Sequence, residues 1–167
     1  MTLSTVDEQG YPDARILILK SVDARGWNFA AKADSPKGQQ LDSNGHAALT
    51  FYWPEVGRQI RLRGRAVVLP EAKCMQDFAA RPLLSKASAV ASKQSQVLAD
   101  RDELIHRVAE VQDAVTDVEE QGFRKWKVYA VAPKEVEFWQ GSNDRLHRIR
   151  YMTETKFGPW RKDLLWP

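Results

Sequence analysis

Three arginines at alternating positions are the side chains whose type and spacing first suggest chemistry. Arg61, Arg63 and Arg65 share one face of a predicted strand, and the apolar Ile60 and Leu62 share the other. Guanidinium groups bind carboxylates and phosphates through paired N–H donors, so the arginine face could line a groove for an anion. A solvated outer face explains the same pattern equally well. The spacing alone leaves both interpretations open.

Most other arrangements that carry chemistry are missing from the sequence. It contains no glycine-rich phosphate or dinucleotide loop and no nucleophile elbow. His46, His106 and His147 lack the spacing of metal ligands, so we expect no metal site. Cys74 lies among apolar residues of a predicted helix, which favours a packed core thiol over a nucleophile. A bound phosphate would therefore have to be held by arginine, lysine and hydroxyl side chains.

The composition is that of an ordinary globular chain. With 167 residues, 43% of them hydrophobic and 28% charged, and with no repeat or linker, we expect one domain over residues 1–167. The net charge of +3 is too small to indicate nucleic acid as a partner. No apolar run approaches the ~20 residues of a membrane span, and no secretory signal opens the sequence. A single cysteine fits the reducing cytoplasm, where we expect the protein to reside.

Strands outnumber helices in the pattern of apolar and turn residues. The predicted strands cover residues 3–6, 14–19, 27–31, 47–53, 58–68, 126–131, 135–140 and 160–166. The strand over 14–19 is apolar on both faces, which favours a central, covered position. Pro54 and Gly57 mark the turn of the hairpin that contains the arginine face, and residues 21–26 are predicted as a turn.

Helices are predicted where capping residues meet helical periodicity. They cover residues 35–45, 70–80 and 100–121, with short helices and loop over 83–99. The first begins with Ser35 as its N-cap and Pro36 at its first helical position. The third begins at Asp100 and is broken by Gly122, and its apolar positions are Leu104, Val108, Val111 and Val115. Because strands and helices do not alternate regularly, we expect an antiparallel barrel with helices packed outside it.

Several segments together resemble the pyridoxamine 5′-phosphate oxidase family, in the family's order and over essentially the whole chain. The most specific combination is Glu137-Phe-Trp-Gln-Gly141 with Arg145-Leu-His147. The other matching segments are Leu3-Ser-Thr-Val-Asp7, Gly10-Tyr-Pro12, Arg15-Ile-Leu-Ile-Leu-Lys20, Phe51-Tyr-Trp53, Gly57-Arg-Gln59, Arg81-Pro82, Ser92-Lys-Gln-Ser95 and Trp160 to Pro167.

The resemblance implies a fold, a cofactor and a reaction. The fold would be mainly β with α, an antiparallel Greek-key split β-barrel with flanking helices. The protein would be a homodimer with FMN at the subunit interface and a small-molecule substrate, a phosphorylated pyridine in the family. The reaction would transfer a hydride from C4′ of pyridoxamine or pyridoxine 5′-phosphate to FMN, with O2 as the final acceptor.

The resemblance also implies which residues bind the flavin: Arg15, Ile16, Leu17, Ile18, Lys20, Ser35, Lys37, Gln59, Gln94, Ser95, Trp139 and Arg148. Arg15 and Lys20 would contact the ribityl-phosphate part, Lys37 the phosphate and Gln59 the isoalloxazine. Because Arg15 and Lys20 are five positions apart, both reach one ligand only if the strand ends or twists before Lys20. The second subunit would contribute Gln94 and Ser95. Trp139 and Arg148 would complete the half of the flavin site that this second subunit provides.

The substrate residues follow from the same resemblance. The phosphate would be bound by Lys20, Arg81 and Ser85, and the catalytic residues Arg145 and His147 would face the pyridine ring. Each assignment has a simpler alternative. Core packing explains a tryptophan at 139, capping of the preceding helix explains Arg81, and a surface loop explains Arg145 and His147.

Four features depart from the family pattern. The segment that precedes the first strand in the family, and contributes to its substrate site, has no counterpart in this sequence. Asp77 stands where the family has a phosphate-binding tyrosine, and a carboxylate there would repel a phosphate or take up a proton. Ala30, Ala31 and Pro36 replace polar or basic residues that usually hold the FMN phosphate. An aspartate that follows Arg-Leu-His in the family is deleted, so that Arg148 takes the place of the flavin-contacting arginine.

These departures keep three further functions open. Asp77 and the missing first segment favour a related flavin oxidoreductase that acts on another small molecule. The loss of phosphate donors at positions 30, 31 and 36 is compatible with a binding module, with or without flavin, that does not turn over. Nucleic-acid binding through the arginines of 58–65 is the most distant alternative.

Overall fold

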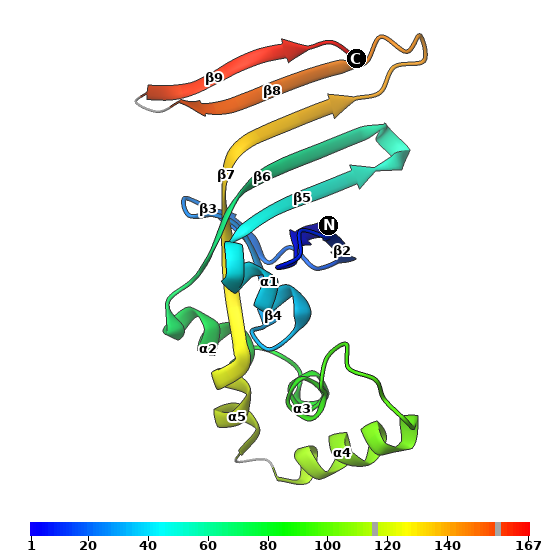
Figure 1. Cartoon of the computed structure of the whole chain (residues 1–167), viewed down its shortest axis with the longest axis vertical. Coiled ribbons are helices and arrows are strands. Elements are labelled where there is room, and N and C mark those ends of the chain that lie inside the picture. Colours follow the sequence, from blue (N-terminus) through cyan, green and yellow to red (C-terminus); the bar gives the residue numbers. More distant parts are fainter. Residues whose placement is uncertain (115–116, 156–157) are drawn as a thin grey trace. The chain divides into compact units, whose positions relative to one another are not determined.

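The computed structural model describes residues 1–114, 117–155 and 158–167 of the chain. Its strands are β1 Thr2–Val6, β2 Pro12–Ile16, β3 Ser21–Asp23, β4 Gly26–Lys32, β5 His46–Trp53, β6 Arg58–Val68, β7 Trp126–Gln140, β8 Arg148–Thr155 and β9 Gly158–Leu165 (Figure 1). Its helices are α1 Pro36–Asn44, the short η1 Pro54–Val56, α2 Glu71–Ala79, α3 Leu83–Ala91, α4 Arg101–Asp113 and α5 Asp117–Lys125. No helix in these ranges is long and apolar enough to cross a membrane.

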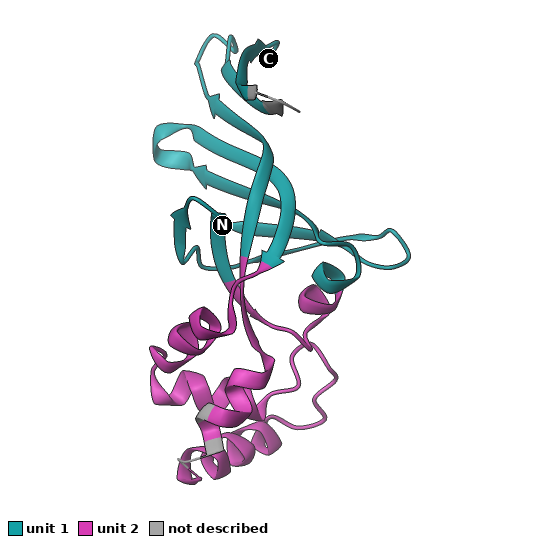
Figure 2. Ribbon diagram, turned by 90° about the vertical axis from the view of Figure 1, so that its left-hand side faces the viewer, with its two compact units in different colours: residues 1–29, 40–67, 130–167 teal, residues 30–39, 68–129 magenta. Residues whose placement is uncertain are grey.

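The chain forms two compact units, which Figure 2 shows in different colours. The first, here called the sheet unit, consists of residues 1–29, 40–67 and 130–167. The second, here called the helical unit, consists of residues 30–39 and 68–129 and contains α2 to α5. That residues 1–167 form a single domain stays a prediction.

The strands form one sheet in the order β2-β1-β5-β6-β7-β4-β3. The strand β8 also pairs with β7, and β9 pairs with β8. The predicted hairpin is confirmed, since β5 pairs with β6 antiparallel and Phe51 lies opposite Ile60. Gly57 closes its turn with a φ of 55°, a left-handed conformation that glycine adopts readily. Leu49 and Leu62, which also face each other, are both buried in the core of the sheet unit.

The prediction of a central, covered strand over 14–19 is wrong. The strand β2 ends at Ile16 and lies at one end of the strand order, beside β1. Ile16 is 75% exposed and Ile18 is 78% exposed, so the apolar run lies on an edge rather than in the core. The chain forms the separate strand β3 at 21–23, where a turn was predicted. The expected end of the strand before Lys20 is confirmed.

Near the C-terminus the predicted strands differ from the observed ones in length and number. The two strands predicted over 126–131 and 135–140 are one continuous strand, β7, which passes through Pro133. The strand β8, which pairs with both β7 and β9, was not predicted. The predicted last strand is confirmed as β9, which begins earlier, at Gly158.

The first two predicted helices are confirmed as α1 and α2, whereas the third, predicted over 100–121, is observed as the separate helices α4 and α5. The side chain of Asp100 accepts a hydrogen bond from the amide of Asp102 and caps α4. The predicted break at Gly122 is wrong, since α5 runs through it to Lys125. A Cβ at Gly122 would lie 2.0 Å from the ring of Phe78, so the glycine makes room for that ring. Val115 lies outside the described residues.

The core of the helical unit is an aromatic cluster. Phe78 is fully buried and packs edge-on against Phe123 and Trp126, with ring centroids 5.5 and 5.8 Å apart. Cys74 is buried beside them, and its Sγ accepts a hydrogen bond from the amide of Val128. The interpretation of Cys74 as a core thiol is confirmed.

Two of the three arginines on the alternating face of β6 bind carboxylates of β7, so the groove that they line with these carboxylates is not set up for an anion. Both nitrogens of the Arg61 side chain that face β7 donate to Glu137, at 3.1 and 2.8 Å, and Arg63 donates to Glu135 at 2.6 and 2.8 Å. Such bidentate pairs fix geometry as well as charge. They therefore hold the register of β6 against β7.

The first prediction concerns the closest backbone approach between these strands. A Cβ at Gly64 would lie 1.9 Å from the carbonyl oxygen of Ala132, which cannot move without breaking the sheet. We expect Gly64→Ala to lower the free energy of unfolding by about 2–3 kcal/mol, measured by urea denaturation. Gly10→Ala, where a Cβ would meet nothing within 4 Å but φ is 89°, is the control for backbone strain without a clash and should cost less. Equal losses in the two variants would contradict the steric argument.

The second prediction concerns pH. The Arg63 guanidinium holds the pKa of Glu135 below its usual value, with a smaller contribution from Tyr151 and with burial opposing. A lowered carboxylate pKa adds stability above the pKa of the unfolded chain, and this stability is lost as the pH falls through the folded pKa. Glu135→Gln should therefore lower stability at pH 7 by at most ~1 kcal/mol, because Arg63 is largely exposed, and the difference should vanish in acid. Denaturation of both proteins from pH 7 to pH 3 measures it, and a difference that grows in acid would refute the assignment.

Candidate functional site

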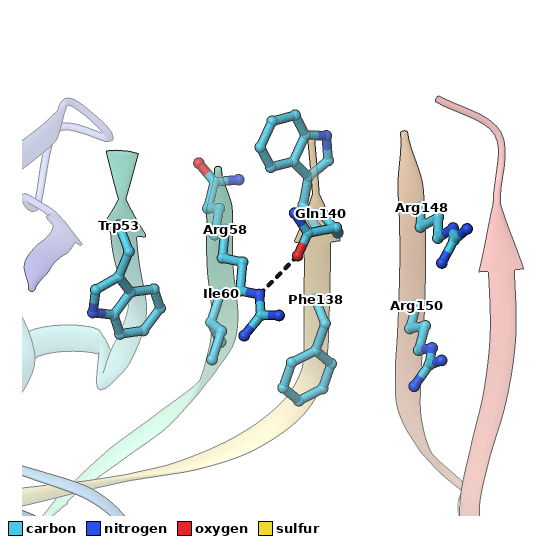
Figure 3. A pocket seen from close by; sticks show the side chains of 9 residues that line it. Trp53, Arg58, Ile60, Phe138, Gln140, Arg148 and Arg150 are labelled. Atoms are coloured by element: carbon cyan, nitrogen blue, oxygen red, sulfur yellow. Dashed lines mark hydrogen bonds between the residues drawn. The ribbon is translucent and has the colours of Figure 1, made fainter. Parts of the chain in front are cut away.

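A groove of about 420 Å³ lies on the sheet unit, at the end of the hairpin (Figure 3). Side chains of four neighbouring strands line it: Trp53 of β5, Arg58, Gln59 and Ile60 of β6, Phe138, Trp139 and Gln140 of β7, and Arg148 and Arg150 of β8. Aromatic rings, amides and guanidinium groups are the usual components of a pocket for a flat, polar-edged ligand.

Hydrogen bonds across the strands fix the shape of this groove. Arg58 Nε donates to Gln140 Oε1 at 2.7 Å, as the dashed line in Figure 3 shows, and the amide of Gln140 donates to the Val56 carbonyl at 3.2 Å. The backbone amide of Gly141 donates to the carbonyl of Gly57 at 2.8 Å. The turn of the hairpin is thereby tied to the end of β7.

Three of the residues predicted to bind the flavin meet in this groove. Gln59, Trp139 and Arg148 are far apart in sequence and all line it. Arg150, which was not predicted, lies on the same face of β8 as Arg148, because Arg148 pairs with Gln140 and Arg150 with Phe138. Their alternation is a visible signal once 148–155 is recognised as a strand.

The two predicted catalytic residues lie in the turn between β7 and β8. The ring of His147 packs against Trp139, with centroids 4.9 Å apart, and its Nδ1 accepts a hydrogen bond from the amide of Ser142 at 3.1 Å. A neutral His147 therefore carries its hydrogen on Nε2. Arg145 is exposed and does not belong to the residues that line the groove.

The backbone of Arg145 is unusual. Among the described residues other than glycine, Arg145 and Ser95 have positive φ angles, of 65° and 67°. Such conformations cost free energy in residues with a Cβ and concentrate at functional sites. Both residues were predicted as site residues, so the turn geometry agrees with that assignment, while their roles stay predictions.

The segment from Arg15 to Lys20, which was predicted to bind the flavin, is bound within the sheet unit at its first residue and is exposed or half-buried after it. Arg15 forms an ion pair with Asp13 and donates to the hydroxyl of Thr5 at 2.6 Å and to the amide oxygen of Gln40 at 3.3 Å. Its guanidinium is thus already bound within the sheet unit. Lys20 is exposed, and its backbone amide donates to the carbonyl of Asn28. Between them Ile16 and Ile18 are exposed, while Leu17 is half-buried.

In the helical unit, Ser35 and Lys37 form a buried polar cluster at the start of α1. The Ser35 hydroxyl donates to the Lys32 carbonyl at 2.7 Å and accepts from the Gly38 amide at 3.3 Å, so it caps the helix. Lys37 Nζ lies 3.4 Å from the same hydroxyl, and the residue is only 6% exposed. A serine and a buried ammonium at a helix N-terminus are chemically suited to an anion.

A second buried lysine, Lys32, precedes α1 and was missed from the sequence. Lys32 is 5% exposed, and its Nζ donates to the carbonyl of Ser92 at 2.5 Å. Burial lowers its pKa, and Asp34, at 3.8 Å, opposes that shift. Asp34 lies closer to Lys125, at 2.9 Å. Lys32 and Lys125 therefore share one carboxylate.

Of the residues predicted to bind the substrate phosphate, Arg81 contacts Trp126. The Arg81 guanidinium lies over the indole, 4.1 Å from its centroid, and Nη2 donates to the carbonyl of Ser85 at 3.2 Å. The indole Nε1 donates to Asp77 Oδ2 at 2.8 Å. Burial lowers the pKa of Arg81, and the charge of Asp77 opposes this. The alternative that Arg81 caps the preceding helix is not supported, since its side chain contacts α3.

The remaining predicted residues, Gln94 and Ser95, lie in the loop between α3 and α4. Both are exposed. An exposed position is what a role in the other subunit's site requires, but it does not test that role.

Two family models match adjoining parts of the chain. Pyridoxamine 5′-phosphate oxidase matches residues 1–115, and the pyridoxine 5′-phosphate oxidase C-terminal dimerisation region matches residues 126–167. The pyridoxine/pyridoxamine 5′-phosphate oxidase of Pseudomonas savastanoi pv. phaseolicola is 40% identical over 168 residues, which cover 100% of this chain and 77% of the relative. That of Pseudomonas syringae pv. tomato is 41% identical over 152 residues, or 90% and 71% of the two chains.

Solved structures agree with the sequence relatives. PhzG from Burkholderia lata, solved in complex with tetrahydrophenazine-1-carboxylic acid, matches with a TM-score of 0.89 and 31% identity over 99% of this chain and 81% of its own. An FMN binding protein of Nostoc punctiforme related to pyridoxamine 5′-phosphate oxidase matches with a TM-score of 0.76 over 99% and 86%, and at 13% identity it shows the fold alone. The predicted split β-barrel with helices is confirmed.

The third prediction tests the cap of the buried cluster. Ser35→Ala removes the acceptor of the Gly38 amide and should cost about 1–2 kcal/mol of stability, measured by urea denaturation. Ser43→Ala, on an exposed position of the same helix, is the matched control and should stay within about 0.5 kcal/mol. If both variants unfold alike, Ser35 does not cap α1.

Proposed function

Because this chain belongs to the pyridoxamine 5′-phosphate oxidase family, we propose that it is an FMN-dependent oxidase that binds the flavin ring in the groove of the sheet unit. The observation that carries the proposal is that Trp139 and Arg148 line one groove of about 420 Å³ although they come from different strands, since the resemblance assigns both to the same half of the flavin site. Gln59, which the resemblance assigns to the other half, also borders this groove.

The residues present fit FMN. In the groove, Trp139 and Trp53 offer ring faces, Gln59 an amide for the polar edge of the isoalloxazine, and Arg148 a positive charge. In the helical unit, Ser35 and Lys37 offer donors for the phosphate. The cluster can therefore hold a phosphate in spite of the replacements at positions 30, 31 and 36.

The family model over 126–167 is a dimerisation region, which supports a homodimer. We place the flavin at the interface, where exposed Gln94 and Ser95 of the second subunit would contact it. The sheet unit exposes several large apolar side chains, as surfaces that meet a partner do: Ile16, Ile18, Leu164 and Trp166. A second copy would cover them.

When bound, FMN accepts a hydride from a carbon of the substrate and passes the electrons to O2, which leaves as hydrogen peroxide. The chain itself has to orient the substrate so that this carbon faces the flavin. We assign the ring of the substrate to Arg145 and His147. His147 is held by Ser142 and Trp139 in a tautomer whose Nε2 donates a hydrogen bond. In the family the carbon is C4′ of pyridoxamine or pyridoxine 5′-phosphate, with Lys20, Arg81 and Ser85 on the phosphate.

A second candidate function is oxidation of another small molecule, and the contact between Asp77 and Trp126 beside Arg81 favours it. The solved PhzG of Burkholderia lata holds a carboxylic acid, tetrahydrophenazine-1-carboxylic acid. Either substrate leaves the flavin chemistry unchanged. A location in the cytoplasm stays a prediction.

The fourth prediction tests the flavin and the substrate role together. The purified protein, with FMN added and then dialysed, should keep a visible flavin absorption band. Arg145→Ala should keep the same band, because Arg145 does not line the groove, while its kcat/KM in a peroxide assay falls about 100-fold from lost orientation. Arg101→Ala, an exposed arginine of α4, is the control and should match the unmodified protein.

Two outcomes would contradict this proposal in different ways. A protein that takes up no FMN would be a binding module that has kept the split barrel without its cofactor. A flavoprotein whose Arg145→Ala variant turns over normally would keep the cofactor assignment and remove Arg145 from the substrate site.

A further inference from the structure

We propose that the substrate of this oxidase carries a hydroxyl or another uncharged polar group, and no phosphate, at the end that meets Arg81. The inference rests on the proposed function, and it specifies the substrate class of the same site. Its basis is the arrangement of Asp77, Arg81 and Trp126 in the helical unit. There the Asp77 carboxylate and the Arg81 guanidinium contact the same indole, and Arg81 is the one arginine among the residues predicted to bind the substrate phosphate.

One indole fixes both charged side chains. Asp77 lies in α2, and Arg81 follows four positions later, a spacing that brings two side chains to the same side of a helical turn. The Trp126 N–H binds the Asp77 carboxylate at 2.8 Å, while its ring face holds the Arg81 guanidinium at 4.1 Å. Trp126 itself is 8% exposed and packs on the core residue Phe78. Neither charge can therefore leave the site without disturbing packed structure.

The charge of this arrangement does not suit a phosphate dianion. The positive charge of Arg81 and the negative charge of Asp77 cancel, and both residues are half-buried, where charges interact more strongly than in water. A dianion bound to Arg81 would face the carboxylate as a like charge. This repulsion weakens the binding of a dianion relative to a neutral group.

The hydrogen-bonding capacity that remains points to a neutral group. Arg81 Nη2 donates to the Ser85 carbonyl, and its Nε is buried away from any ligand. A guanidinium has five N–H donors, so others can still meet a ligand. A hydroxyl accepts from such a donor, donates to a carboxylate and brings no charge. The site is thus complementary to an unphosphorylated ring alcohol.

A purely structural role for Asp77 makes a different prediction. If Asp77 served only as the acceptor for Trp126, an asparagine would do the same, because its amide oxygen also accepts. Asp77→Asn keeps the size and the acceptor and removes the charge. The structural role then predicts no change in ligand preference, whereas our proposal predicts a change toward the phosphorylated ligand.

The experiment uses the FMN-loaded full chain, and its flavin spectrum is recorded before any ligand is added. Pyridoxine and pyridoxine 5′-phosphate are then titrated, with dissociation constants from the change in flavin absorbance and turnover from peroxide release. The unmodified protein should bind pyridoxine at least about tenfold more tightly than its phosphate ester, since like charges disfavour the ester. Asp77→Asn should tighten binding of the ester at least about tenfold and change pyridoxine little. Asp42→Asn, which removes an exposed carboxylate of α1, controls for net charge and should change neither.

The outcomes separate this proposal from the proposed function. Tighter binding of the ester by the unmodified protein overturns the proposal and leaves the FMN-dependent oxidase intact. If the unmodified protein binds neither ligand, Asp77→Asn decides: a gain of ester binding supports the proposal, and no gain overturns it. Absence of a flavin spectrum at the start overturns both.

Discussion

The pairing of β6 with β7 is the contact on which the sheet unit and its groove depend. A glycine at 64 lets the strands approach where any Cβ would meet the Ala132 carbonyl. Two cross-strand ion pairs, from Arg61 and Arg63, fix the register on one face, and the bond from Arg58 to Gln140 fixes it at the groove. A slip by one residue would exchange the faces of all side chains on β7. The register of this single pair thus decides which rings and amides line the groove.

In the helical unit, the arrangement of the charged side chains depends in a similar way on one residue, Trp126. It packs against Phe78 in the core, carries Arg81 on its face and binds Asp77 through its N–H. A buried indole N–H requires an acceptor, so packing explains why residue 77 is polar. It does not explain why that residue is charged, since an amide or a hydroxyl would also accept. The negative charge at 77 lies beside the half-buried Arg81 guanidinium and offsets its charge, so it limits the charge that a ligand can bring to this arginine.

Local signals predicted local structure, and the errors arose where distant residues decide. The hairpin and the helix starts at Ser35 and Asp100 follow from turn and capping residues next to them in the sequence. The apolar run over 14–19 has the composition of a core strand, but its place at the sheet edge depends on the strands beside it. Gly122 has the composition of a helix stop, but the ring of Phe78, 44 positions away, makes it a packing position. For the site, resemblance supplied Gln59, Trp139 and Arg148, and it could not supply Lys32 or Arg150, whose positions follow only from burial and strand register.

The two anion-binding regions that the resemblance assigns differ in charge. At the start of α1, the buried ammonium of Lys37 lies 3.4 Å from the Ser35 hydroxyl, where a helix N-terminus also favours an anion. Beside Arg81, the chain has Asp77, whose negative charge offsets that of the guanidinium. The first region therefore has the positive charge that a flavin phosphate needs, whereas the second lacks the net charge that a substrate phosphate needs. The charges argue for a flavin that is retained and a substrate that has changed.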